Sequence, residues 1–399
     1  MNEKSKCTIK NPQNVKTADI IIGIPSLNEA DNIRFVVETV DKGLRKYYKK
    51  YKCVIINVDN NSPDGTGKVF METKTVNPKI YVSTCNGVRG KGNNFLNLFN
   101  QVKELDAQAV TVVDADMQSI TPEWVKAFLD PILNKKYDFV TPYYSRNEYD
   151  GTITNNIAYP LVYGLYGIDL RQPIGGDFSF SSRIVNSWIA KKWHKPTKQY
   201  GVDIFMTLEA IIGDYKICQV SLGQKIHKPS APKLGPMFSQ VVATILKQII
   251  ISKDKWMKTD KVVNIPMFGR KKSGHPQPMG VDYKSMKITS IFEYKINRDI
   301  LKRALTPEIF GKIDDMYKEE EIDIGKTLWT KVLYDCVYAY DTTDLNMGLV
   351  EALRPLYFGR LISFIRRTLD MSHEESEEEI KEQAKRFWEL RQYLIEKYK

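Results

Sequence analysis

The sequence predicts an α/β fold with a mostly parallel sheet, followed by a region that is α-helical. Short apolar runs alternate with segments of helical periodicity through the first two thirds of the 399 residues. That alternation is typical of strands joined by crossover helices, which build a parallel sheet. From residue 300 onward the pattern is helical to the end of the sequence. We therefore expect an α/β domain over residues 17–235 and a mainly helical subdomain over residues 236–399.

The first strand and the helix after it have the clearest patterns. Residues 18–25 form an apolar, isoleucine-rich run of the kind found in buried strands. Residues 28–48 follow with the helical spacing of apolar side chains. Ser26 and Glu29 have the spacing of a capping box, so we expect the strand to turn directly into this helix.

The later elements continue the alternation. Thr121 and Pro122 have the pattern of a helix start with proline in the first turn. Further strands are predicted at residues 53–58, 79–84, 110–113, 138–143 and 215–222, and further helices at residues 153–166, 203–212 and 238–252.

Composition and charge limit the class of protein. The net charge is +11, but the lysines are dispersed among acidic residues and form no basic block, so we expect no nucleic-acid partner. A cleft that attracts diphosphates and carboxylates would account for part of this charge. No apolar run approaches the roughly 18 residues of a membrane span, and residues 1–16 lack the apolar stretch of a secretory signal. We expect a soluble, cytoplasmic protein without a membrane partner.

The strongest local motif is a pair of aspartates directly after a predicted strand. Asp114 and Asp116 follow Thr111-Val112-Val113, at the end of a predicted strand, where open α/β sheets bind ligands. Carboxylate oxygens there suit Mg²⁺ or Mn²⁺ bridging a diphosphate. A capped turn is the alternative, because aspartate is common in turns.

A glycine-flanked lysine precedes another predicted helix. Gly90-Lys91-Gly92 could bring backbone and a positive charge to an anion, or could be a surface turn. It is not a P-loop, because the required spacing is absent. Glu29 and Asp59 lie at the ends of the first two strands. Each could stabilise a turn or a helix cap, or could instead contact the hydroxyls of a nucleoside.

His227 lies just beyond the strand predicted at residues 215–222. A single histidine is usually structural. At a strand end, however, an imidazole could complete a metal site begun by Asp116.

These motifs, in this order, resemble a GT-A glycosyltransferase domain. The first strand ends Ile24-Pro25-Ser26-Leu27-Asn28-Glu29, the second ends Val58-Asp59-Asn60-Asn61-Ser62, and Gly90-Lys91-Gly92 and Asp114-Ala115-Asp116 follow. Residues 171–177 (RQPIGGD), 200–203 (YGVD) and Ile226-His227 narrow the resemblance to mannosylglycerate synthase and its relatives, glucosylglycerate synthase and glucosyl-3-phosphoglycerate synthase. The resemblance covers about residues 18–235 and, more loosely, the helical region.

The resemblance implies roles residue by residue. Asp116 and His227 match metal ligands, and Asp203 and Asp114 match the catalytic acids. Asp203 would hold the transferred hexose. The implied donor site consists of Pro25, Glu29 and Asp59 at the nucleoside end, Lys91, Asp114 and Lys228 near the diphosphate, and Ile174, Gly175, Gly176 and Asp203 around the sugar.

The acceptor segment is the most specific part of the resemblance. In mannosylglycerate synthase an arginine at a strand end is followed at plus four by aspartate and at plus eight by threonine. Arg146, Asp150 and Thr154 keep that spacing. A guanidinium can clasp a carboxylate with two hydrogen bonds, while Asp and Thr hold hydroxyls. The predicted acceptor site is completed by the intervening residues Gly151, Thr152 and Ile153.

The resemblance predicts a metal-dependent, configuration-retaining hexosyltransferase (EC 2.4.1 type). It would move glucose or mannose from a UDP- or GDP-linked donor to D-glycerate, forming a compatible solute. The close alternative uses 3-phosphoglycerate, with Lys271 or Lys272 as further contacts for the phosphate. A non-catalytic nucleotide-sugar-binding regulator is the more distant alternative. The C-terminal helices could form a homodimer interface or pack on their own domain.

Overall fold

The structure is a computed structural model that describes residues 8–228, 234–269, 276, 279–280 and 282–399. The chain forms two compact units. The first consists of residues 1–145, 174–233 and 265–274, and the second of residues 146–173, 234–264 and 275–399. The division predicted at residue 235 is thus one of several, because residues 146–173 leave the first unit and the chain returns to it at Ile174. Lys271 and Lys272 lie outside the described residues.

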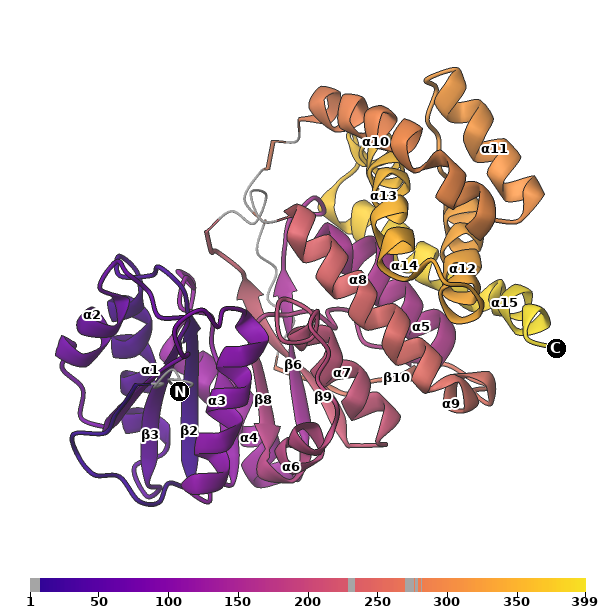
Figure 1. Cartoon of the computed structure of the whole chain (residues 1–399). Helices are drawn as coiled ribbons and strands as arrows, with labels where there is room; N and C mark the ends of the chain where they lie inside the picture. The colour runs from indigo at the N-terminus through magenta and orange to yellow at the C-terminus, as the bar shows by residue number, and fades with distance from the viewer. Residues whose placement is uncertain (1–7, 229–233, 270–275, 277–278, 281) are drawn as a thin grey trace, which may run out of the picture. The chain divides into compact units, whose positions relative to one another are not determined.

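The first unit is built on a nine-stranded sheet (Figure 1). Neighbouring strands are parallel except at the pairs of β1 with β4, β5 with β8 and β6 with β8. The predicted, mostly parallel sheet is therefore confirmed. In spatial order the strands are β1 (Ile9–Lys10), β4 (Lys79–Ser83), β3 (Cys53–Asp59), β2 (Ile20–Ser26), β5 (Ala109–Val112), β8 (Phe178–Ser181), β6 (Phe139–Ser145), β9 (Ile217–Gln224) and β11 (Met267–Phe268).

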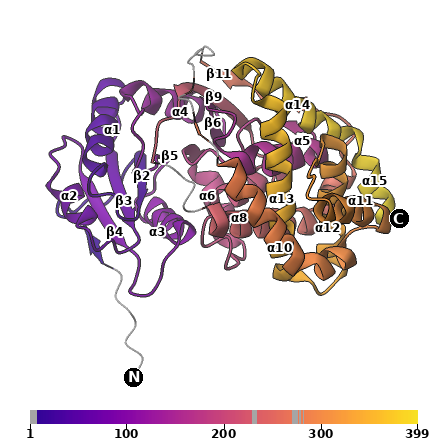
Figure 2. The ribbon, with the colours of Figure 1, turned by 90° about the horizontal axis from the view of Figure 1, so that it is seen from above.

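Side chains of β2 alternate between the two faces of the sheet. Ile20, Ile22 and Ile24 belong to the core cluster that also contains α1 (Ile33–Tyr47) and α4 (Pro122–Lys135). Gly23 instead faces Leu98 of α3 (Lys91–Glu104). Helices therefore cover both faces (Figure 2), which explains why β2 is apolar up to its last residue. The other helices of this unit are α2 (Thr66–Glu72), α6 (Ser182–Ala190) and α7 (Val202–Ile212).

The capping box predicted from Ser26 and Glu29 is wrong. Ser26 is still in β2, and its hydroxyl donates to Asp59 Oδ1 at 2.7 Å. The N–H of Glu29 donates to Thr66 Oγ1 at 2.9 Å, and α1 begins only at Ile33. The spacing matched, but the neighbouring strand β3 supplied a better hydrogen-bond partner than the local turn.

The second unit is helical, as predicted (Figures 1 and 2). Residues 154–158 are a π-helix rather than the start of a regular helix, and the Trp329 indole N–H donates to Asn156 O at 2.7 Å. None of the helices within the described ranges is both long and apolar enough to cross a membrane. The elements are η1 (Thr154–Ala158), α5 (Tyr159–Tyr166), β7 (Ile168–Asp169), α8 (Leu234–Ile251), α9 (Lys253–Met257), β10 (Val263–Asn264), α10 (Tyr283–Ala304), α11 (Pro307–Lys318), α12 (Lys326–Thr342), α13 (Asn346–Thr368), α14 (His373–Glu389) and α15 (Arg391–Lys397).

We predict that Gly23→Ala destabilises the protein, whereas Gly311→Ala stabilises it. A Cβ at Gly23 would lie 2.4 Å from Leu98 Cδ2, so the buried Leu98 side chain, or α3 with it, would have to shift, at a cost of about 1–3 kcal/mol. Nothing lies within 4 Å of a Cβ at Gly311 in α11, where alanine should add about 0.5–1 kcal/mol. Denaturant unfolding of both variants measures the two effects. Equal stabilities would contradict the packing of α3 on β2.

Candidate active site

Several polar residues of the first unit meet at one edge of the sheet. Strands β2, β3, β5, β6 and β9 run in the same direction, so their carboxyl ends lie at this edge. Strand β8 runs the opposite way, and its first residues therefore start there. Asp114 and Asp116 follow β5, Asp177 precedes β8, and Lys225 follows β9. The topology brings these four side chains together although they are far apart in sequence.

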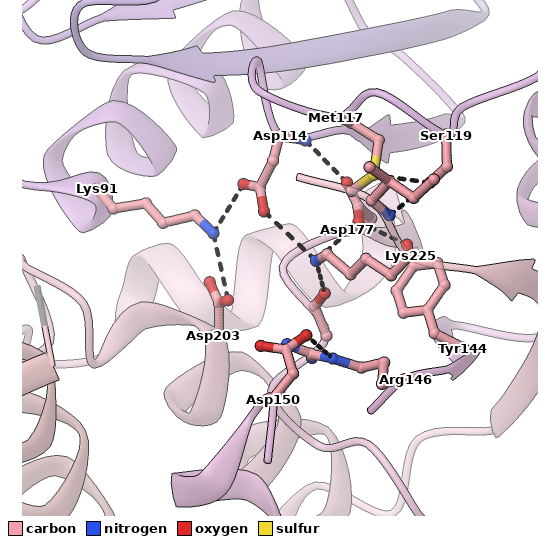
Figure 3. Close-up of polar contacts among 12 residues, drawn as sticks. Lys91, Asp114, Met117, Ser119, Tyr144, Arg146, Asp150, Asp177, Asp203 and Lys225 are labelled. Atoms are coloured by element: carbon pink, nitrogen blue, oxygen red, sulfur yellow. Dashed lines mark hydrogen bonds and ion pairs between the residues drawn. The ribbon is translucent and has the colours of Figure 1, made fainter. Parts of the chain in front are cut away.

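Lys91 lies between two carboxylates (Figure 3). Its Nζ is 3.0 Å from Asp114 Oδ1 and 3.3 Å from Asp203 Oδ2. Lys91 begins α3, and Asp203 lies in the first turn of α7. The two catalytic acids suggested by the resemblance therefore share one cation.

Gly92 permits the approach that places Lys91 beside Asp203. Its N–H donates to Gln199 O at 3.0 Å. A Cβ at Gly92 would lie 2.2 Å from the carbonyl oxygen of Thr197. Gly92 of the glycine-flanked lysine motif therefore serves close backbone packing. The sequence pattern alone had left open whether this motif is an anion site or a surface turn.

Asp177 is fully buried and accepts three hydrogen bonds. The N–H of Asp114 donates to its Oδ1 at 2.8 Å, and the Tyr144 hydroxyl donates to its Oδ2 at 2.5 Å. Lys225 Nζ lies 3.5 Å from the same Oδ2 and 2.8 Å from Gly175 O. Asp177 and Lys225 thus fix the position of Asp114. Gly176, with φ +85°, allows this packing, because a Cβ there would lie 2.3 Å from Asp114 Oδ2.

The acids of this cluster differ in pKa for identifiable reasons. Burial opposes ionisation of Asp114, but the charges of Lys91 and Lys225 outweigh it and hold its pKa at about 2. Burial raises the pKa of Asp203 to about 6, and Lys91 offsets this only in part. Burial likewise raises the pKa of Asp177 above its ordinary value. One ionised acid thus lies beside acids that resist ionisation.

The predicted metal ligands are connected through the loop that follows β5. The N–H of Gln118 donates to Ile226 O at 2.8 Å, and the N–H of Ile226 donates to Ser119 Oγ at 2.9 Å. These bonds hold His227 against the loop that contains Asp116. Burial, and then the charge of Asp114, raise the pKa of Asp116. In the part of the chain that the structure describes, no three His, Cys, Asp or Glu side chains are grouped to hold a metal.

The residues predicted at the nucleoside end are held by ion pairs and turns. Lys228 Nζ is 2.7 Å from Glu29 Oε2 and 2.8 Å from Asp31 Oδ1. Burial raises the pKa of Glu29 despite the hydrogen bond from Lys228. Asp59 is fully buried and accepts hydrogen bonds on both oxygens, from Ser26 Oγ on Oδ1 and Tyr81 OH on Oδ2 among others. Asp59 therefore stabilises the turn after β3, and its contact with a nucleoside stays a prediction.

Two of the remaining predicted donor residues adjoin the cluster of lysines and aspartates. Gly175 and Gly176 adjoin the lysine–aspartate cluster through Lys225 and Asp114. Pro25 is buried within β2, where it pairs with Val58 of β3. Ile174, directly before Gly175, is half-buried.

The predicted acceptor residues lie in the second unit. Arg146 Nε donates to Asp150 Oδ2 at 2.9 Å, an ion pair that Figure 3 also shows. Both residues line a small pocket with Gly151 and Thr154. Gly151 has φ +69°, and a Cβ there would lie 3.1 Å from the Arg146 guanidinium carbon. The predicted spacing therefore corresponds to one pocket wall.

Two residues of the predicted acceptor segment do not line this pocket. Thr152 Oγ1 lies 2.6 Å from the Tyr357 hydroxyl, and Ile153 is buried. Both anchor the segment within the second unit. Their contact with an acceptor stays a prediction.

Sequence reasoning missed several residues at these sites. Lys225 and Tyr144 carry no local motif, and only the strand order brings them to Asp177. Arg171 and Glu377 form a bidentate pair that lines the same pocket as Arg146 and Asp150, at 2.8 and 3.0 Å. Arg171 lies in the segment that resembles the family, whereas the charged helix containing Glu377 reads as solvated surface.

A mostly parallel sheet with this buried cluster at its carboxyl edge agrees with the GT-A glycosyltransferase domain that the sequence resemblance predicts. Residues 21–192 match the family described as glycosyl transferase family 2. A curated relative, glucosyl-3-phosphoglycerate synthase of Petrotoga mobilis, is 24% identical over an alignment of 283 residues that covers 65% of this chain and 80% of the relative. The chain is thus a glycosyltransferase that carries a family 2 domain and is related to glucosyl-3-phosphoglycerate synthase.

Solved structures of glucosyl-3-phosphoglycerate synthase from Mycobacterium tuberculosis are also similar. The complex with Mg²⁺ and uridine diphosphate is 23% identical, covers 58% of this chain and 79% of that chain, and has a TM-score of 0.47. The complex with Mn²⁺, uridine diphosphate and glucosyl-3-phosphoglycerate is 22% identical, covers 58% and 80%, and has a TM-score of 0.46.

We predict that Asp203→Asn changes how stability depends on pH. The Asp203 pKa is raised from 3.8 to about 6, so between these values the folded protein holds a proton that the unfolded chain has lost. The free energy of unfolding therefore falls as pH rises through this window, by on the order of 3 kcal/mol, and the effect is constant above it. Urea unfolding from pH 4 to 7 should show a smaller fall for the variant. Parallel curves would contradict the assigned pKa.

Proposed function

We propose that this chain transfers a hexose, glucose or mannose, from a UDP- or GDP-linked donor to 3-phosphoglycerate. The observation that carries the proposal is the buried Lys91–Asp114–Asp203 cluster at the carboxyl edge of a family 2 sheet. The relationship to glucosyl-3-phosphoglycerate synthase supports the acceptor.

We infer that a divalent metal, Mg²⁺ or Mn²⁺, is required. Asp114, Asp116, Asp177 and Asp203 lie around two lysines, so full ionisation would leave a formal charge of −2. A divalent cation would balance that charge. Asp116 and His227 could hold it, because a carboxylate oxygen and an imidazole nitrogen are both metal ligands. When bound, it would neutralise charge that develops on the leaving diphosphate. Diphosphate oxygens would complete its ligands.

Asp203 and Lys91 would position the transferred hexose and the diphosphate to which it is attached. Asp203 Oδ1 is buried without a hydrogen-bond partner among the described residues, so it can accept from a hexose hydroxyl. Lys91 would stabilise the negative diphosphate. Asp177 already accepts three hydrogen bonds, which leaves it poorly suited as a nucleophile. We therefore favour front-face attack with retention, and a covalent glycosyl-enzyme trapped at Asp203 or Asp177 would contradict it.

D-Glycerate is a second candidate acceptor. In the pocket of the second unit, Arg146 and Arg171 are each paired with a carboxylate, from Asp150 and Glu377. The two pairs carry no net charge. A pocket without net charge would favour D-glycerate, which has one negative charge, over 3-phosphoglycerate, which carries the additional charge of its phosphate.

Product formation by the purified protein tests the proposal. UDP- and GDP-linked glucose and mannose are each combined with 3-phosphoglycerate or D-glycerate, with Mn²⁺, Mg²⁺ or EDTA. We expect a metal-dependent phosphoglycoside detected by mass spectrometry. A product with D-glycerate alone would favour the second candidate. Absence of product in every combination, with nucleotide binding retained, would favour a non-catalytic regulator.

We predict that Asp116→Asn weakens both Mn²⁺ binding and transfer. The amide keeps the shape of the side chain but loses the charge that would bind the cation, and activity should fall at least about 100-fold. Isothermal titration of Mn²⁺ in the presence of UDP measures the binding. Asp130→Asn, a change of an aspartate on α4 that contacts Lys126, is the control. Unchanged Mn²⁺ affinity in Asp116→Asn would rule out Asp116 as a ligand.

A further inference from the structure

The pocket of the second unit contains two arginines in matched settings. Arg146 pairs with Asp150, and Arg171 pairs with Glu377. Their side chains are 13% and 11% exposed, so both guanidinium groups are largely withdrawn from water. The sequence resemblance gives a role only to Arg146. Arg171 is a second planar cation in the same pocket.

The bond between Arg171 and Glu377 has the geometry in which arginine binds an oxyanion. Arg171 Nε donates to Glu377 Oε2 at 3.0 Å, and its terminal NH2 donates to Oε1 at 2.8 Å. Two parallel bonds of this kind also bind phosphate or a substrate carboxylate. Glu377 therefore occupies the position on Arg171 that an anionic ligand would take.

Arg171 has a second support that does not depend on Glu377. Its guanidinium carbon lies 5.3 Å from the centre of the Tyr159 ring. The Tyr159 hydroxyl donates to Asp169 Oδ1 at 2.8 Å, which fixes the ring. This cation–π contact would help to keep the guanidinium group in place when Glu377 leaves.

Glu377 is carried to the pocket by the apolar face of α14. Ile380 and Ala384, three and seven residues further on, are buried in a cluster with Tyr159 and Phe364. The Glu377 side chain itself is 28% exposed, against 11% for Arg171. It can therefore turn toward water, whereas the arginine is confined.

We propose that Arg171 is a second anion subsite of the acceptor pocket and that Glu377 competes for it, so that this pair selects acceptors by charge. The inference rests on the proposed function. The phosphate of 3-phosphoglycerate would bind Arg171 by displacing Glu377. D-Glycerate lacks the phosphate and leaves the pair intact. The strength of the Arg171–Glu377 pair thus sets the preference between the two acceptors.

The test is the ratio of kcat/KM for 3-phosphoglycerate to kcat/KM for D-glycerate. Glu377→Gln keeps one acceptor for Arg171 but removes the competing charge, so the ratio should rise about tenfold, a change of about 1.4 kcal/mol. Arg171→Gln should lower the ratio. This variant provides a second test of the inference if Glu377→Gln does not fold. Glu378→Gln is the matched control, because the neighbouring Glu378 is 60% exposed and contacts Lys385; its ratio should equal that of the wild type.

Equal ratios in the wild type, Glu377→Gln and Arg171→Gln would overturn the inference while leaving the proposed function intact. Calorimetric titration of each acid without donor separates the two failures. Absence of both product and acceptor binding in every protein would overturn the proposed function and the inference together. Tighter binding of 3-phosphoglycerate by Glu377→Gln, without the same gain for D-glycerate, would support the inference.

Discussion

The site in the first unit depends on the burial of more carboxylates than cations. Asp114, Asp177 and Asp203 surround Lys91 and Lys225, and Asp116 lies beside them. Burying a charge costs several kcal/mol unless it is paired. The lysines hold Asp114 ionised, while burial raises the pKa of the other three acids. This excess of carboxyl groups over lysines makes the cluster a place where a cation, or the hydroxyls of a sugar, could be bound.

That cluster exists only because the backbone is closely packed around it. Gly92 lets a carbonyl-lined loop touch the start of α3, and Gly176 lets the chain pass beside Asp114. A side chain at either position would separate the lysines from their partners. The charged cluster therefore depends on the backbone conformations at Gly92 and Gly176, and a change in one would disturb the other.

The sequence could predict the features that depend on residues close together in the chain. Apolar runs located the strands, and Asp114 and Asp116 at a strand end located the site, because strand ends are local features. It could not predict Lys225 and Tyr144 at Asp177, since these contacts depend on β8 entering antiparallel between β5 and β6. Glu377 was missed for a related reason: the helix α14 is highly charged, and only packing shows which of its acids faces inward.

Both units hold the cations of their predicted sites on internal carboxylates. Lys228 is bound by Glu29 and Asp31, and Arg146 and Arg171 are bound by Asp150 and Glu377. A substrate anion that binds at these sites would therefore exchange with a protein anion instead of meeting an unpaired charge. Such an exchange lowers affinity for any anion, but it avoids an uncompensated buried cation in the absence of ligand. Selectivity then follows from which substrate replaces all the bonds that the internal carboxylate gives up.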